Sequence, residues 1–351
     1  MLAKNATSRD HHGPRGRPSR RPWLSRALRH WVLDRTTAAA LRWAPRLSPA
    51  AVEGLTAVVS RLGPHCPVLA RQVAENMRNV GLYSPDAHRA YFAAVARHLA
   101  GALHALRCAR HAIPGGVSPR LADIVTSRVT LDASFDALRA MIRPDRGAVL
   151  VGPHVSGYLL HLARLNQELP LTVYLRYSKD ARRRAAKEQW YRATGVGWIS
   201  EPPDAGGAFG RLGRMAAAVA AGRTLFITPD LPRKREAGVA VRFFDRQVWL
   251  PEGPAVLALR TGAPLFMLLA QSTATGERLT LHGPYPAEGR AGGRAARRAA
   301  LQHRMQWFSD HFAAWLSRHA PLWYLWGDKR WTRVLHDDSR YGQRLAAGEP
   351  G

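Results

Sequence analysis

From about residue 128 onward, short apolar runs alternate with segments in which apolar residues recur every three or four positions. The runs are GAVLVG, LTVYLR, VGWIS, RTLFITPD, APLFMLLA and RLTLHG. Between them the spacing predicts helices over 132–143, 158–168, 179–194, 207–221, 253–261 and 296–318. Strands separated by helices are typical of an α/β fold with a mostly parallel sheet flanked by helices. We predict this fold class for residues 128–335.

The chain before this region has a helical pattern. Over residues 27–127 Ala, Leu and Val recur at helical spacing, and Ser84 is placed to cap a helix whose first residue is Pro85. We expect residues 1–26 to form a solvated basic tail, with an electrostatic tether to lipid or nucleic acid as the alternative. No apolar core of the kind that a signal peptide needs follows this tail. Residues 336–351 are expected to form a C-terminal tail.

The charge balance is strongly basic, because 52 Lys and Arg residues face 25 Asp and Glu residues and leave a formal net charge of +27. Such a surface attracts polyanions, and both nucleic acid and an anionic membrane fit it. No uncharged stretch reaches the roughly 20 residues that cross a bilayer, so we expect any membrane contact to be peripheral. Cys66 and Cys108 show neither a disulfide framework nor metal-ligand spacing, which fits a reducing cytoplasmic setting without a metal.

His154 follows the apolar run GAVLVG behind a Gly-Pro turn, which places it at the carboxyl end of a predicted strand. Ligands of α/β proteins gather at that edge of the sheet. Gly152 and Gly157 allow the backbone to approach a ligand, and Ser156 with Gly157 can open a helix whose N–H groups suit a phosphate or an oxyanion. A neutral imidazole there can take a proton from a hydroxyl that attacks an acyl carbon. The alternative is a histidine that only hydrogen-bonds its own loop. Asp230 follows LFIT in the same way as His154 follows its strand.

The motif order resembles a known family. GAVLVGPH, VYLR, TLFITPD, FFDRQVWLPEGPAVLALRTGAPL and PLWYLWGDKRW follow one another as in the bacterial lipid A biosynthesis (lauroyl/myristoyl) acyltransferases of the lysophospholipid acyltransferase group. RQVAENMRNVGLYSP is similar to the helix ahead of that family's catalytic domain, so the resemblance spans roughly residues 30–333. It implies a glycerolipid acyltransferase-like fold and an acyl donor that is a thioester of acyl carrier protein or coenzyme A, with no further cofactor.

The resemblance also implies roles for individual residues. The family's catalytic histidine matches His154, and the arginine after its next strand matches Arg176. Its Pro-Asp turn matches Pro229 and Asp230, and the glycine ahead of its following helix matches Gly253. The aromatic and basic closing segment of the family corresponds to Trp323, Trp326, Lys329, Arg330 and Trp331.

One position departs from the family pattern. Members carry Glu or Asp five residues after the histidine to orient its ring, whereas this chain has Leu159 there. Without a carboxylate the imidazole lacks the partner that fixes its tautomer. Asp230 can supply the carboxylate from a neighbouring strand, or positioning and an oxyanion hole suffice for a reactive thioester. The third alternative is a degenerate homologue that binds lipid or acyl carrier without turnover.

Basic and aromatic segments indicate the acceptor. Arg176 and Arg233 are predicted anion contacts near the site, and PLWYLWGDKRW suits a lipid headgroup boundary, with core packing of two of its tryptophans as the alternative. Trp43, Leu55 and Val59, with Trp31, can form a lipid-facing stripe, although core packing is the commoner outcome. We predict transfer to a hydroxyl or amine of a membrane glycolipid or lysophospholipid at the cytoplasmic face of a bacterial inner membrane. Nucleic-acid binding is the rival from another class, but the sequence contains no recognisable nucleic-acid module.

Overall fold

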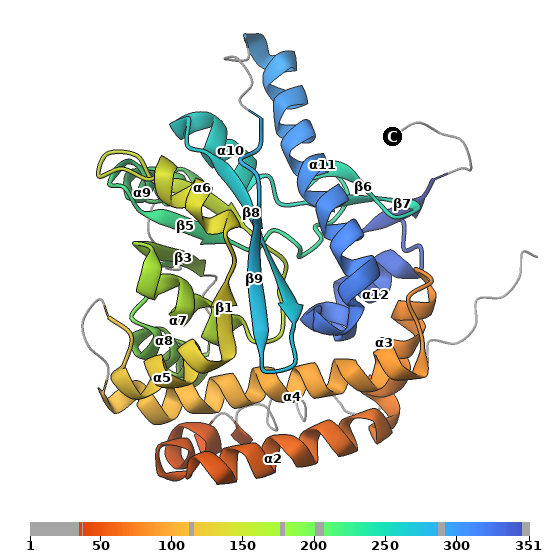
Figure 1. Ribbon diagram of the computed structural model, residues 1–351. Helices are drawn as coiled ribbons and strands as arrows, with labels where there is room; N and C mark the ends of the chain where they lie inside the picture. Colours follow the sequence, from red (N-terminus) through yellow and green to blue (C-terminus); the bar gives the residue numbers. More distant parts are fainter. Residues whose placement is uncertain are drawn as a thin grey trace, which may run out of the picture.

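The computed structural model describes residues 35–36, 38–111, 116–175, 180–200, 207–286 and 292–345. A seven-stranded sheet forms the centre of the α/β region (Figure 1), with the strand order β1-β9-β8-β2-β5-β3-β4. The bounds are β1 (Val129–Leu131), β2 (Ala148–Val151), β3 (Leu171–Leu175), β4 (Gly197–Ser200), β5 (Thr224–Ile227), β8 (Leu265–Ser272) and β9 (Glu277–His282). β8, β2, β5, β3 and β4 run parallel, whereas β9 is antiparallel to β8. The predicted α/β fold with a mostly parallel sheet is confirmed.

The central strands are mostly apolar because helices cover the sheet. Every residue of β2 and of β5 is buried. The six helices predicted in this region are present: α6 (Ser134–Met141), α7 (Tyr158–Glu168), α8 (Ala181–Thr194), α9 (Gly207–Ala220), α10 (Gly253–Thr261) and α11 (Gly293–His319). α7 contacts β1 and β3, α10 contacts β2, and α9 contacts β4 and β5. Glycines in the left-handed conformation end two of these helices, Gly195 after α8 and Gly262 after α10.

A second sheet, which the sequence analysis did not predict, lies beside the first. It is antiparallel, with the strand order β10-β7-β6, and contains β6 (Val239–Phe243), β7 (Arg246–Leu250) and β10 (Gly342–Arg344). α11 packs against β6, and α12 (Lys329–Leu335) packs against β10. Residues 342–344 of the predicted C-terminal tail thus pair with the body of the protein.

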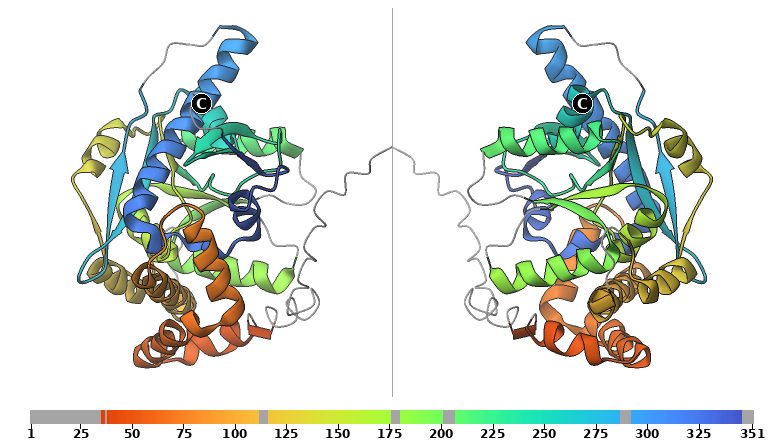
Figure 2. Two further views of the ribbon diagram at one scale, coloured as in Figure 1. Left: turned by 90° about the vertical axis from the view of Figure 1, so that its right-hand side faces the viewer. Right: turned by 90° about the vertical axis from the view of Figure 1, so that its left-hand side faces the viewer.

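Helices precede the sheet, as predicted. They are α2 (Pro49–Leu62), α3 (Pro67–Arg78), α4 (Pro85–Cys108) and α5 (Pro119–Arg128), with the short 3₁₀ turns η1 (Ala44–Arg46), η2 (Gly63–His65) and η3 (Ala109–His111). Ser84 caps α4 by accepting the Ala87 N–H over 3.0 Å, with Pro85 in the first turn. Figures 1 and 2 show α4 across one end of the sheet and α2 on the outer side of α4.

The helical region and the sheet share one core. Val73 and Met77 of α3 and Phe92 of α4 belong to the same buried cluster as the residues of β2 and β8. Two further 3₁₀ turns, η4 (Ala320–Leu322) and η5 (Tyr324–Gly327), connect α11 to α12. Among the described residues, none of the helices is both long and apolar enough to span a membrane.

Candidate active site

His154 and Asp230 lie side by side at the carboxyl edge of the sheet. His154 follows β2 and Asp230 follows β5, and these neighbouring parallel strands pair Val151 with Ile227. His154 and Asp230 are each the third residue after the end of their strand, so the two residues occupy equivalent positions at this edge. The Asp230 side chain is fully buried, whereas 31% of the His154 side chain is exposed. The pair thus combines a shielded carboxylate with an imidazole that a substrate can reach.

The Asp230 carboxylate holds both the ring and the backbone of His154. Nδ1 of His154 lies 2.5 Å from Oδ1 of Asp230, and the backbone N–H of His154 donates to Oδ2 over 2.7 Å. A carboxylate facing Nδ1 favours the tautomer that carries its proton on Nδ1. Nε2 is then the proton acceptor of the ring, and the Thr228 hydroxyl lies 3.3 Å from it.

Two tryptophans of the closing segment fix Asp230 in turn. Trp323 donates its indole N–H to Oδ2 of Asp230 over 3.0 Å, and Trp331 donates to the Asp230 carbonyl over 2.7 Å. Both indoles are fully buried, as is that of Trp326. The prediction of a lipid headgroup boundary is therefore wrong for the three tryptophans of this segment, and the alternative of core packing, which was offered for two of them, is confirmed. Tyr324 is the exposed aromatic residue of the segment.

The closing segment also binds the loop of His154. The N–H of Tyr324 donates to the His154 carbonyl and the N–H of Ser156 donates to the Leu322 carbonyl, each over 2.9 Å. The expectation that Ser156 offers a free backbone N–H to a substrate anion is therefore wrong. Its side chain is fully buried as well.

Gly157 leaves room for a buried hydrogen-bonded pair, His161 and Glu277, and does not form an open anion site. It precedes α7 with a φ of 86°, a conformation that favours glycine. A Cβ at Gly157 would collide with the carboxylate of Glu277 and would lie 2.9 Å from Nε2 of His161. His161 and Glu277 are buried and hydrogen-bonded to each other. Because this carboxylate already lies against the N-terminal end of α7, the site is unfavourable for a second anion.

The other predicted binding residues have different surroundings. Gly152 packs against neighbouring strands, since a Cβ there would lie 2.9 Å from the Leu268 carbonyl. Gly253 begins α10 and faces open space. Arg233 has an exposed side chain three residues after Asp230, with its N–H bonded to the Trp249 carbonyl over 2.7 Å. Arg176 lies outside the described residues.

Leu159, at the position of the family's orienting carboxylate, is buried in the first turn of α7. A charged side chain there would have to enter the core, where an unpaired charge is strongly disfavoured. The structure thus brings a carboxylate to the ring from β5 instead of from α7.

A further histidine, His98 of α4, contacts the closing segment: its ring lies 4.8 Å from that of Tyr324, centroid to centroid, at a tilt of 37°. Burial, and to a lesser extent the charges of His161 and His154, lower the pKa of His98 from 6.5 to about 4. His98 is therefore neutral at physiological pH. Sequence reasoning missed His98, His161, Glu277 and Thr228, because no spacing along the chain relates them to His154.

A small, mostly apolar cavity lies beside the His154 loop. Pro153 and Val155, the chain neighbours of His154, line it together with Tyr158, His161 and Phe226, whereas His154 and Asp230 are not among its lining residues. Within the described part of the chain, no group of three or more His, Cys, Asp or Glu side chains is arranged to hold a metal ion.

The mostly parallel sheet, with a histidine and a carboxylate at its carboxyl edge, is the architecture of an α/β enzyme that uses a histidine–acid pair. Comparison with sequence families specifies the class: the model of the bacterial lipid A biosynthesis acyltransferases matches residues 122–333, more than half of the chain. The chain belongs to this acyltransferase family. A comparison with curated proteins finds no match.

Proposed function

We propose that this chain transfers an acyl group from a thioester of acyl carrier protein or coenzyme A to a hydroxyl, or an amine, of a membrane glycolipid or lysophospholipid. The observation that carries the proposal is the 2.5 Å contact between Nδ1 of His154 and the buried Asp230, with the ring partly exposed. Such a pair supplies the base that acyl transfer to a hydroxyl needs.

In the proposed reaction, His154 acts first as a base. The acceptor hydroxyl lies near Nε2, where the Thr228 hydroxyl already lies within 3.3 Å. As the hydroxyl oxygen attacks the thioester carbonyl carbon, its proton moves to Nε2. The imidazolium formed is stabilised by the Asp230 carboxylate on Nδ1.

His154 then acts as an acid. The carbon–sulfur bond breaks, the carbonyl re-forms, and the leaving thiolate takes the proton from Nε2, so that the ring returns to its starting state. The products are an ester and a free thiol. Asp230 keeps the ring in one orientation through both steps, because its second oxygen is fixed by the His154 and Trp323 N–H groups.

The substrates suggest where the protein works. Arg233 lies exposed three residues after Asp230, and we expect it, with Arg176, to contact phosphate groups of the acceptor or the donor. A lipid acceptor and a thioester donor meet at the cytoplasmic face of the bacterial inner membrane. We therefore propose a peripheral location there, which the net charge of +27 favours on anionic lipid.

The test combines purified protein, acyl carrier or coenzyme A thioesters of different chain lengths, and a lysophospholipid or a lipid A precursor. We expect free thiol and a lipid that has gained the mass of the acyl group, both lost in His154→Ala. The exposed His303 on α11 provides a matched control, and His303→Ala is expected to keep full activity. If the wild type forms no acylated lipid with any donor, or if His154→Ala is as active, the proposal is wrong and a binding function without turnover replaces it.

A further inference from the structure

Large apolar side chains are exposed in one region of the molecule. Among the described residues, seven large hydrophobic side chains are exposed, and six of them lie between residues 43 and 69. They are Trp43, Leu55, Val58, Leu62, Val68 and Leu69, and we refer to them together as the apolar face. Exposed apolar residues gathered in this way mark an interaction surface more often than scattered ones do.

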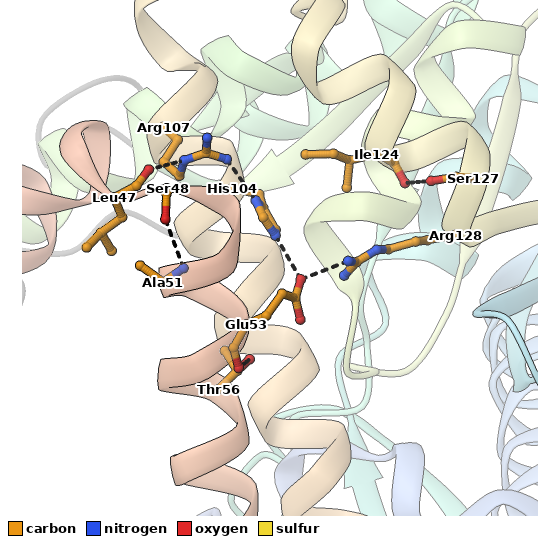
Figure 3. Close-up of polar contacts among 10 residues, drawn as sticks. All are labelled: Leu47, Ser48, Ala51, Glu53, Thr56, His104, Arg107, Ile124, Ser127 and Arg128. Atoms are coloured by element: carbon orange, nitrogen blue, oxygen red, sulfur yellow. Dashed lines mark hydrogen bonds and ion pairs between the residues drawn. The ribbon is translucent and has the colours of Figure 1, made fainter.

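The apolar face cannot turn into the core, because the opposite side of α2 is fixed to the body of the protein. Figure 3 shows Glu53 of α2 between His104 of α4 and Arg128 of α5. Its Oε1 lies 3.3 Å from Nε2 of His104 and 2.8 Å from Nη2 of Arg128. Val52 and Thr56 are buried on the same side. Arg107 of α4 donates to the carbonyl of Leu47, just before α2, over 2.7 Å.

On α2 the apolar face is a regular stripe. Leu55, Val58 and Leu62 follow one another at intervals of three and four residues, so they share one side of the helix. Leu62 is 62% exposed. The stripe therefore lies in solvent, away from the buried Val52 and Thr56. Glu53 remains 47% exposed while it is paired with Arg128.

Arginines surround the apolar face. Residues 42–78 contain five arginines and two glutamates, a net charge of +3, and one of the glutamates, Glu53, is paired with Arg128. Arg42 and Arg46 lie over the Trp43 ring, at 5.4 Å and 5.6 Å from its centroid. An apolar stripe with arginines at its rim suits the boundary between acyl chains and anionic headgroups. A second copy of this chain, with its own charge of +27, would be repelled.

The apolar face is joined directly to the loop of His154. Leu69 of α3 is in close contact with Gly327, because a Cβ at that glycine would lie 2.9 Å from Leu69 Cδ1. Gln72 of α3 donates to the Gly327 carbonyl over 3.0 Å. In the same 3₁₀ turn, the exposed Tyr324 donates its N–H to the His154 carbonyl. A bilayer that covers the apolar face is thus next to the site.

We infer that the apolar face, formed by Trp43 just before η1 and by residues of α2 and α3, docks the protein on an anionic phospholipid bilayer. Its rim consists of Arg42, Arg46, Arg61 and Arg71. The choice of a bilayer rests in part on the lipid acceptor of the proposed function. Docking would place the catalytic pair beside the headgroups, and it requires neither turnover nor the side chain of His154.

The experiment is flotation of the full chain with vesicles of phosphatidylcholine, with and without phosphatidylglycerol. We expect binding to the anionic vesicles. The double variant Leu55→Ser with Leu62→Ser should bind at least about tenfold more weakly, because two leucines no longer enter the apolar layer. Val58→Trp should bind more tightly, since tryptophan favours the interface. A denaturant unfolding curve that matches that of the wild type shows that this gain does not come from a misfolded chain.

A charge-matched pair separates docking from general attraction. Arg61→Gln with Arg71→Gln removes two charges from the rim. Arg297→Gln with Arg298→Gln removes two exposed charges from the first turns of α11, and the N-terminal end of this helix lies across the molecule from α2 in Figure 1. We expect the first pair to lose more binding than the second. Equal losses, or serine variants that float like the wild type, would overturn the inference. So would a wild-type dimer in solution that the serine changes convert to monomers.

Failure of the proposed function gives a different pattern. His154→Ala should float like the wild type. If the wild type floats through the apolar face but forms no acylated lipid, the docking inference stands and the acyl-transfer proposal is wrong.

Discussion

Asp230→Asn is the substitution that most directly tests how the catalytic pair works. The Asp230 carboxylate accepts three N–H groups: Nδ1–H and the backbone N–H of His154, and the indole N–H of Trp323. Asparagine has one side-chain oxygen and one NH₂ group. The oxygen can keep the two N–H groups now on Oδ2, which leaves the NH₂ group facing Nδ1. The ring then has to accept at Nδ1 and carry its proton on Nε2.

This tautomer has no free base toward the acceptor hydroxyl. In the serine protease triad the equivalent change lowers kcat about 10⁴-fold for the same reason. A thioester needs less assistance than an amide, so we expect a loss of about 10²–10³-fold here, or about 3–4 kcal/mol of transition-state stabilisation. KM should change little, because Asp230 is fully buried and does not reach the substrate. The fold should lose only about 1 kcal/mol, since every hydrogen bond can be re-formed.

The assay is the initial rate of thiol release over a range of acceptor concentrations, together with a denaturant unfolding curve. Asp136→Asn is the matched control, because Asp136 is an exposed carboxylate on α6 whose partner is Arg139. We expect it to leave kcat unchanged. An Asp230→Asn enzyme within tenfold of the wild-type kcat, with a folded-state stability close to that of the wild type, would refute the orienting role.

Three further predictions follow from the same region. Gly157→Ala should destabilise the protein by about 1–3 kcal/mol in urea, because alanine is strained at this φ and collides with Glu277, whereas Gly54→Ala, which meets open space in α2, should be neutral or slightly stabilising. Trp331→Phe should cost about 1–3 kcal/mol of stability by leaving the Asp230 carbonyl without its indole donor, and a variant as stable as the wild type would contradict this. The pKa of His98 is about 4 in the folded chain against 6.5 unfolded, so the unfolded state binds the extra proton. The free energy of unfolding therefore decreases as the pH falls from 6.5 toward 4, by at most about 3 kcal/mol, and above pH 6.5 His98 causes no such loss. His98→Gln should flatten this slope in unfolding curves at pH 7 and pH 5.

The strands and helices could be predicted because the spacing of apolar residues along the sequence reflects which residues are buried. β2 and β5 are buried on both sides, and their sequences are correspondingly apolar except for Thr224. Sequence also places His154 and Asp230 after strands. It does not give the strand order, so the contact between these two residues could only be offered as one alternative until β2 and β5 were seen as neighbours.

Other features left weaker signals. β6 mixes exposed and buried residues over five positions, and such a short strand is hard to tell from a loop. For Trp323 and Trp331 the sequence left both a lipid boundary and core packing open, because indoles are common in either place, and here each N–H has a buried acceptor on Asp230. For Leu55 core packing was the commoner expectation and a lipid-facing stripe the alternative, and Leu55 is exposed because α2 buries Val52 and Thr56 instead.

Because position 159 carries no acid, the carboxylate that orients the His154 ring comes from another element, while its role at the ring stays the same. A carboxylate five residues after the histidine is carried by the helix that follows, so its distance from the ring depends on the turn between strand and helix. Asp230 is carried by the adjacent strand, and the pairing of Val151 with Ile227 sets the separation of the two loops. Backbone hydrogen bonds between buried strands hold that register firmly. Two indoles then fix the carboxylate from the other side. Leu159 is thereby free to fill the core, because strand register here supplies the geometry that the local motif supplies elsewhere in the family.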